Sequence, residues 1–121
     1  MPTRHAHARW EGTVKEGVGT IDFGHGAFSG PYSFASRFTD GKGTNPEELL
    51  GAAHAGCFAM ALSLVLTSAG FPPGSIDATA YVTVEPRDGG FAITKSHIVC
   101  DATIAGIDSA TFERLAHESK A

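Results

Sequence analysis

Cys57 is the residue of this chain best suited to nucleophilic chemistry. It lies in the stretch HAGCF, inside a long run of small and apolar residues. Only about 3 % of an ordinary thiol with a pKa near 8.5 is thiolate at pH 7, so a reactive cysteine needs a neighbouring cation. Free cysteines are also among the most buried residues of proteins. The pattern alone therefore leaves two interpretations of Cys57 open, a nucleophile and a core residue.

Arg37 is the best candidate for the cation that would activate Cys57, because an arginine keeps its charge when it is buried. His54 lies three residues before the cysteine, but a histidine is usually neutral at pH 7 and can serve for packing alone. A buried arginine needs a counter-charge, which Glu47 or Glu48 could provide. On the strand pattern alone, a solvent-exposed arginine is the alternative interpretation of Arg37.

The stretch TNPEE predicts the start of the helix that carries the cysteine. Asn45 suits the N-cap, Pro46 the first helical position and Glu48 the third, as in a capping box. Gly70 predicts the end, so the helix should cover about residues 46–69. After Glu48 it is apolar nearly all round, with many small residues, and should be buried on most sides.

The length of this helix limits which groups can meet. Glu47 precedes Cys57 by about 15 Å along the axis, so the two cannot share a site on one straight helix. The dipole at the helix start is also too far away to act on the thiol. A chain of 121 residues can hardly surround such a helix by itself, so we expect a partner subunit. If the central helices pair antiparallel, Glu47 of one chain can approach Cys57 of the other.

The flanking segments predict antiparallel sheets. Ala6, Ala8 and Trp10 alternate with polar residues, and PYSFASRF also alternates, which predicts a strand with Arg37 on the face opposite the aromatic residues. After the helix, the runs IDATAYVTVEP and FAITKSHIVCDATI predict two strands joined by the turn RDGG, with Cys100 on a core face.

A second helix should begin at Asp108 or Ser109, with Phe112 and Leu115 starting its apolar stripe. The chain then stops in mid-helix without a C-cap. The order βββ–α–ββ–α indicates a single α+β domain, residues 1–121.

Composition restricts the function classes. With a net charge of −4 and no basic cluster, the chain offers little to nucleic acid. Residues 49–66 carry no formal charge and approach the length of a membrane span, but their many small residues favour a buried helix and no membrane contact. We see no signal peptide, and two cysteines without one favour the reducing cytoplasm. His5 and His7 have no third ligand nearby in sequence, so neither a metal nor another cofactor is predicted.

With these residues in view, the chain resembles the OsmC branch of the OsmC/Ohr hydroperoxide reductases. The resemblance rests on WEG, GPYSFASRF, GTNPEELLGAAHAGCFAMALS, GGFAITK and GIDSATF, and it covers nearly the whole chain. It implies antiparallel sheets wrapped around a long buried central helix in an intertwined homodimer. It also implies a thiol peroxidase of oxidative and osmotic stress defence, which prefers organic hydroperoxides and is recycled by a dithiol such as a lipoyl group.

By motif, the resemblance places Cys57 on the peroxidatic cysteine, Arg37 on the arginine that activates it and Glu47 on that arginine's carboxylate partner. The thiolate would attack the peroxide, release an alcohol and become a sulfenic acid. An apolar substrate pocket is expected to include Phe34, Phe58 and Met60.

The resemblance departs at the C-terminus. Family members carry a resolving cysteine in a GCPV-like segment just after the last helix, and this sequence ends before it, at HESKA. We expect that segment to be missing here, and Cys100 to be a core residue that does not replace it. Two alternatives to a peroxidase stay open: a non-catalytic dimeric domain that binds a small apolar ligand, and a metal or redox sensor built on Cys57 and histidines.

Overall fold

The computed structural model describes residues 2–120, and the chain divides after Leu49 into two compact units. The first contains β1 (Ala6–Glu11), β2 (Val18–Phe23), β3 (Phe28–Tyr32) and α1 (Phe34–Phe38), and the second contains β4 (Ser75–Arg87), β5 (Gly90–Thr103) and α3 (Ser109–Glu118). The long helix α2 (Pro46–Ser68) begins in the first unit and continues through the second. The α+β class with antiparallel sheets is confirmed.

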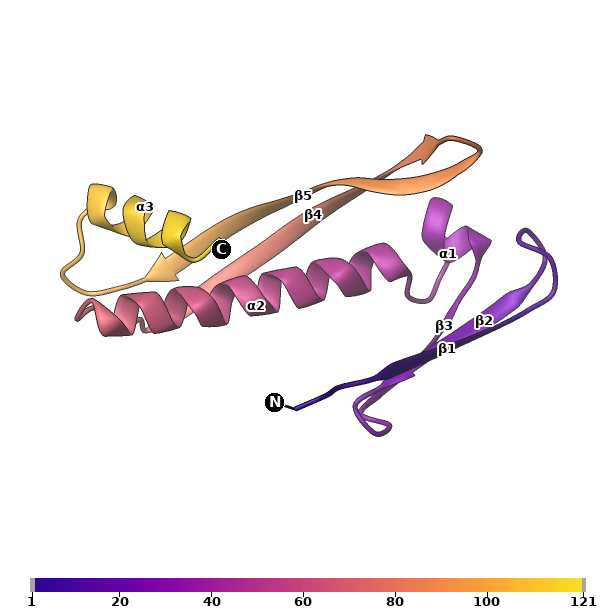
Figure 1. Ribbon diagram of the computed structural model, residues 1–121, viewed down its shortest axis with the longest axis horizontal. Helices are drawn as coiled ribbons and strands as arrows, with labels where there is room; N and C mark the ends of the chain where they lie inside the picture. The colour runs from indigo at the N-terminus through magenta and orange to yellow at the C-terminus, as the bar shows by residue number, and fades with distance from the viewer. Residues whose placement is uncertain (1, 121) are drawn as a thin grey trace. The chain divides into compact units, whose positions relative to one another are not determined.

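In the first unit, the three strands form an antiparallel meander in the order β1-β2-β3 (Figure 1). The strand predicted at Ala6, Ala8 and Trp10 is present as β1, and Trp10 on this strand meets Tyr32 of β3 with ring centroids 5.2 Å apart. The turn between β2 and β3 places His25 at a φ of 54° between two glycines that also have positive φ. Such left-handed backbone is easiest for glycine, which accounts for the GHG sequence there.

The prediction of a strand through Arg37 was wrong, because residues 34–38 form α1. Ser33 is the N-cap: its side chain accepts a hydrogen bond from the Ser36 backbone N–H, and the Ser36 side chain accepts one from the Ser33 N–H. This reciprocal capping box satisfies two donors at the helix start. Phe34 and Phe38 alternate as they would on a strand, but they also stand four residues apart and touch, with centroids 5.0 Å apart.

Helix α2 begins as predicted. The Asn45 side-chain oxygen accepts from the Glu48 N–H at 2.7 Å, and the Asn45 side-chain amide donates to the Glu48 carboxylate at 2.8 Å. The helix ends one residue earlier than expected, in a Schellman motif. Gly70 has a φ of 93° and donates to Thr67 O, while the next N–H donates to Leu66 O.

In the second unit, β4 and β5 form one long antiparallel hairpin. Asp88 and Gly89 connect the strands with φ values of 49° and 80°, as a two-residue type I′ turn requires. Helix α2 runs along one face of the hairpin (Figure 1). At Gly51 the helix approaches closely, because an added Cβ there would lie 3.2 Å from a Val82 methyl group.

The core of the second unit lies between α2, the hairpin and α3. Leu62, Leu66 and Leu115 are its buried residues, and Phe112, Cys100 and Ile104 are among the partly buried residues packed against them. Helix α3 is capped by Asp108, whose carboxylate accepts from the Thr111 N–H at 2.7 Å. That hydrogen bond lowers the pKa of the Asp108 carboxyl group. The expectation of an uncapped helix end was wrong: α3 ends at Glu118, and Ser119 forms its C-cap.

Helix α2 is less buried within the single chain than its composition predicts. It is long and apolar enough to cross a membrane, yet only 22 % of its most apolar window is buried. The core helices of water-soluble proteins can have the same length and composition. Within α2, Gly51, Leu62 and Leu66 are buried, whereas Leu50, Met60 and Leu64 are 45 %, 79 % and 69 % exposed.

Candidate functional site

Arg37 and Glu47 form a close ion pair in the first unit. The Arg37 Nε donates to Glu47 Oε1 at 2.9 Å, and the Glu47 side chain is only 8 % exposed. Among the residues that the structure describes, no hydrogen-bond partner is found for the second carboxylate oxygen, Glu47 Oε2. The pair that was predicted from motif and charge balance is therefore present in space.

The local sequence explains how α1 is held against the start of α2. Asn45 caps α2 and also donates from its side-chain amide to Ser36 O of α1 at 2.9 Å. Ser36 in turn donates from its hydroxyl to Thr44 O at 2.7 Å. These polar contacts hold the short helix α1, which carries Arg37, against the first residues of α2, which carry Glu47.

An aromatic cavity of about 210 Å³ adjoins Arg37 within the first unit. The centre of the guanidinium group lies 5.2 Å from the centroid of the Phe38 ring, within cation–π range. The cavity wall consists of residues from β1, the loop after it, β3 and α1: Trp10, Val14, Tyr32, Ser33, Phe34, Arg37 and Phe38. Of the predicted pocket residues, Phe34 lies here.

Cys57 is exposed in the second unit, which counts against a core role for it. It lines a cavity of about 540 Å³ between α2, β5 and the C-terminal segment. From α2 the lining residues are His54, Cys57, Phe58 and Ala61. The predicted pocket residue Phe58 therefore borders the cysteine, whereas Met60 is not part of this wall.

Cys100 is half-buried and lines the same cavity from β5. Burial raises the pKa of the Cys100 thiol, and the negative charges of Asp101 and Asp77 raise it further. A thiol of this kind stays protonated and is a poor nucleophile at neutral pH. The structure places Cys100 against the core, as predicted, but also opens it to the cavity beside Cys57.

His54 and Ser96 form a contact that the sequence did not reveal. His54 Nδ1 lies 2.7 Å from Ser96 Oγ, so the imidazole is fixed between α2 and β5. The three-residue spacing from His54 to Cys57 was visible in the sequence. The partner Ser96 was not, because it depends on how the hairpin lies against α2.

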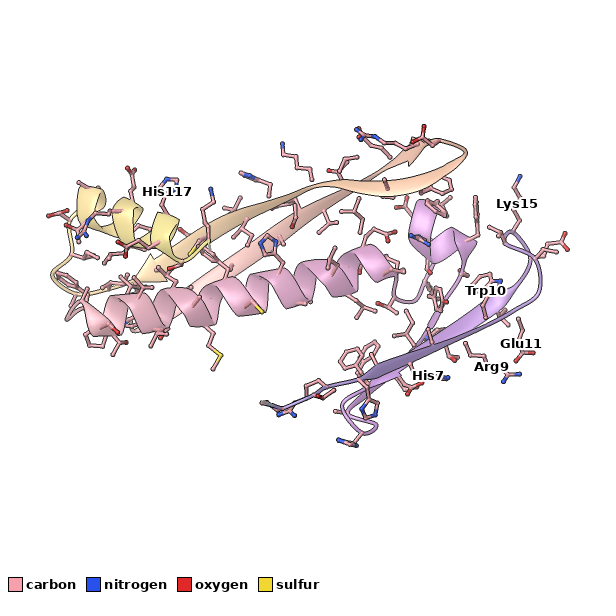
Figure 2. All side chains as sticks on the ribbon, in the orientation of Figure 1. His7, Arg9, Trp10, Glu11, Lys15 and His117 are labelled. Carbon is pink, nitrogen blue, oxygen red and sulfur yellow. The ribbon has the colours of Figure 1, made fainter. Side chains whose placement is uncertain are left out.

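Other cavity residues come from α3 and the residues after it. His117, labelled in Figure 2, and Glu113 line the wall together with Lys120. No group of three or more His, Cys, Asp and Glu side chains suited to a metal ion occurs within residues 2–120.

The exposed side of α2 carries a regular apolar stripe that includes Cys57. Its members, spaced alternately three and four residues apart, are Leu50, Ala53, Cys57, Met60 and Leu64. At about 100° per residue these positions fall on one side of the helix. Beside the stripe, a Cβ added to Gly56 would meet no atom within 4 Å, so backbone is accessible there as well. Spacing of this kind is typical of the contact face between paired helices.

Comparisons with known proteins identify the family. Residues 39–121 match the family described as OsmC-like protein. The chain is 50 % identical over 119 residues to Peroxiredoxin OsmC of Escherichia coli (strain K12), covering 98 % of this chain and 83 % of that protein.

Solved structures share the fold. OhrB of Bacillus subtilis, an organic hydroperoxide resistance protein, matches with a TM-score of 0.67 and 22 % identity, over 95 % of this chain and 82 % of that one. An organic hydroperoxide resistance protein from Elizabethkingia anophelis matches with a TM-score of 0.66 and 25 % identity, over 98 % of this chain and 82 % of that one. The family match and the curated relative together settle the assignment: the chain belongs to the OsmC family.

Proposed function

We propose that this protein is a thiol peroxidase that reduces organic hydroperoxides and, more weakly, hydrogen peroxide. The observation that carries the proposal is the position of Cys57, exposed in the wall of a cavity in a chain 50 % identical to Peroxiredoxin OsmC. Apolar side chains beside the sulfur, such as Phe58 and Ala61, favour a peroxide that carries a hydrocarbon group over the more hydrated hydrogen peroxide.

The reaction consumes one peroxide and oxidises one thiol. The sulfur of Cys57 bonds to the terminal oxygen of the hydroperoxide, the O–O bond breaks, and its electron pair leaves with the alkoxide, which is protonated to the alcohol. Cys57 becomes a sulfenic acid. A dithiol, of lipoyl type by resemblance to the family, supplies the two electrons that return it to the thiol.

In this proposal Arg37 stabilises both the thiolate and the charge that develops on the peroxide oxygens, and Glu47 orients the arginine. The 2.9 Å contact from Arg37 Nε to Glu47 Oε1 supports this assignment, since it engages Nε and does not use the two terminal nitrogens of the guanidinium group. Because Glu47 and Cys57 lie about 15 Å apart along one helix axis, the arginine of one subunit acts on the cysteine of its partner.

A homodimer follows from the same proposal. The exposed stripe Leu50, Ala53, Cys57, Met60 and Leu64 has the spacing of a helix-pairing face. Pairing would remove the large apolar side chains of the stripe from water. Each Å² of apolar surface buried in this way lowers the free energy by about 25 cal/mol. Antiparallel pairing of two such stripes would bring each Cys57 to the subunit interface, where the partner's Arg37–Glu47 pair can approach. We further propose a cytoplasmic location, because a reducing compartment keeps the Cys57 thiol available for the reaction.

Intact mass tests the function directly. After one equivalent of an alkyl hydroperoxide, we expect Cys57 to gain one oxygen, or to enter a disulfide, while Cys57→Ser stays unchanged. A Cys57 thiol that stays unmodified after prolonged exposure would contradict the proposal and favour the alternative, a dimeric domain that binds a small apolar ligand without chemistry.

A further inference from the structure

His54 stands beside Cys57 in the wall of the larger cavity. The two residues are three positions apart on α2, a spacing that places their Cβ atoms about 5–6 Å apart on one helix face. Both line the cavity. The 2.7 Å contact from His54 Nδ1 to Ser96 Oγ engages one ring nitrogen of the imidazole and does not use the other, Nε2.

The peroxide reaction needs a group that can move a proton. The thiol must lose its proton before it attacks, and the alkoxide that leaves must gain one. Arg37 can stabilise charge, but it does not give up a proton in a protein. An imidazole can both accept and donate a proton near neutral pH, which makes histidine the usual residue for this task.

We propose that His54 carries the proton from the Cys57 thiol to the departing alkoxide. The Nε2 atom accepts the thiol proton, the sulfur attacks the terminal peroxide oxygen, and Nε2–H then donates to the alkoxide as the O–O bond breaks. Ser96 is a positioning residue, since its hydroxyl oxygen accepts from Nδ1–H and so keeps Nε2 free of a proton before the reaction. This inference rests on the proposed peroxidase function and assigns its proton transfer.

Other titratable or charged groups face the same cavity. They are Cys100 and His97 on β5 and Glu113, His117 and Lys120 from the C-terminal segment. His54 is assigned the proton because it shares a helix face with Cys57 and because its ring orientation is fixed by the Ser96 contact.

The test measures how fast wild type and His54→Gln react with each of two oxidants at neutral pH. Peracetic acid releases acetate, which needs no proton, whereas tert-butyl hydroperoxide releases an alkoxide, which does. Without the proton carrier, we expect the rate with tert-butyl hydroperoxide to fall on the order of 100-fold or more. The rate with peracetic acid should fall about 10-fold or less, because it loses only the help in forming the thiolate. A purely structural role would slow both reactions by the same factor.

Three further variants sharpen the comparison. Ser96→Ala should shift the ratio of the two rates in the same direction as His54→Gln, and Ser96→Thr, which keeps a hydroxyl group, should restore it. His97→Gln removes a second imidazole from the same cavity and should leave the ratio at its wild-type value. Circular dichroism and thermal unfolding establish which variants fold, and the Ser96 pair carries the test if His54→Gln does not.

The outcomes separate the two proposals. An unchanged ratio in folded His54→Gln and Ser96→Ala, or a ratio that shifts as much in His97→Gln, overturns the assignment to His54 while wild-type activity still supports the peroxidase. Failure of the wild-type Cys57 to react with either oxidant overturns the peroxidase itself.

Discussion

Glu47 accepts a hydrogen bond from Nε of Arg37 at 2.9 Å, although the two residues lie on different helices and ten positions apart. The carboxylate is almost fully buried, while the arginine side chain is 34 % exposed. The contact therefore fixes one end of a charged group and leaves its other end accessible. Such a guanidinium group is prepared to bind an anionic or oxygen-rich ligand without having to be ordered at the moment of reaction.

Replacing Arg37 should remove most of the peroxidase activity. We expect Arg37→Ala to lower the rate of tert-butyl hydroperoxide reduction on the order of 100- to 1000-fold, since it removes the donor that faces the developing charge. Arg37→Lys should restore little of it, because an ammonium group lacks the planar fork. Stopped-flow measurement of peroxide consumption checks both.

The matched control for Arg37 is Arg9, whose Nε donates to Glu11 at 2.8 Å on the exposed strand β1 (Figure 2). Arg9→Ala should leave the rate within about twofold of wild type, as expected for a surface pair. A comparable loss in both variants would mean that the effect comes from overall charge and not from the place of Arg37.

Glu47→Gln tests the orienting role. The amide keeps the shape of the side chain and removes its charge, so we expect a loss of rate of about 10-fold. Stability should fall by about 1–2 kcal/mol in urea unfolding, less than for a fully buried pair because Arg37 is partly in solvent. Glu48→Gln is the control: Glu48 is exposed and accepts from the Asn45 amide at 2.8 Å, and a glutamine oxygen can still accept there, so both the helix cap and the rate should stay close to wild type.

Cys100 should react slowly with electrophiles. Because burial and then the charges of Asp101 and Asp77 raise the pKa of its thiol, a smaller fraction is thiolate at any given pH than for an ordinary cysteine. Iodoacetamide labelling followed by peptide mass should therefore modify Cys100 only at higher pH, and Asp101→Asn should move that labelling to lower pH. Cys100→Ser should keep the peroxide rate within about twofold. Rapid labelling of Cys100 at neutral pH would show that these influences are absent in solution.

A charge placed in the exposed stripe of α2 should disrupt the proposed dimer. We expect Leu64→Glu to shift the protein to a monomer in sedimentation velocity, because a carboxylate in a paired helix face loses its hydration. Val99→Glu, at a 49 % exposed position on β5, is the matched change outside the stripe and should keep the wild-type mass. If Leu64→Glu sediments as wild type does, the stripe does not form the interface.

Local signals in the sequence predicted much of the fold. Asn45 and Glu48 identified the start of α2 because N-capping involves only neighbouring residues, and Gly70 identified its end for the same reason. The same kind of signal was overlooked at Ser33 and Ser36, where alternating aromatic residues suggested a strand and the capping box decided for a helix. A short segment can match both periods, and there the polar caps are the better guide.

The candidate site was harder to predict from the sequence than the fold was. The ion pair of Arg37 and Glu47 followed from motif and from the need to balance a charge, but the contact of His54 with Ser96 spans 42 residues. It depends on how the hairpin packs against α2, and no local pattern encodes that register. Composition predicted that α2 avoids water, but it does not reveal which chain covers the helix, and within a single chain only 22 % of its most apolar window is buried.

The stripe on α2 also has a consequence for abundance. A free protomer with such a surface adheres to other apolar surfaces, including unfolded chains and chaperones. If two copies associate through the stripe, as proposed, that association competes with those contacts by mass action, and the folded lifetime of the protein should rise with its own concentration. In a cell that makes more of this protein under stress, total activity would then rise faster than the number of copies synthesised. The reason is that each new protomer also protects an existing one from degradation.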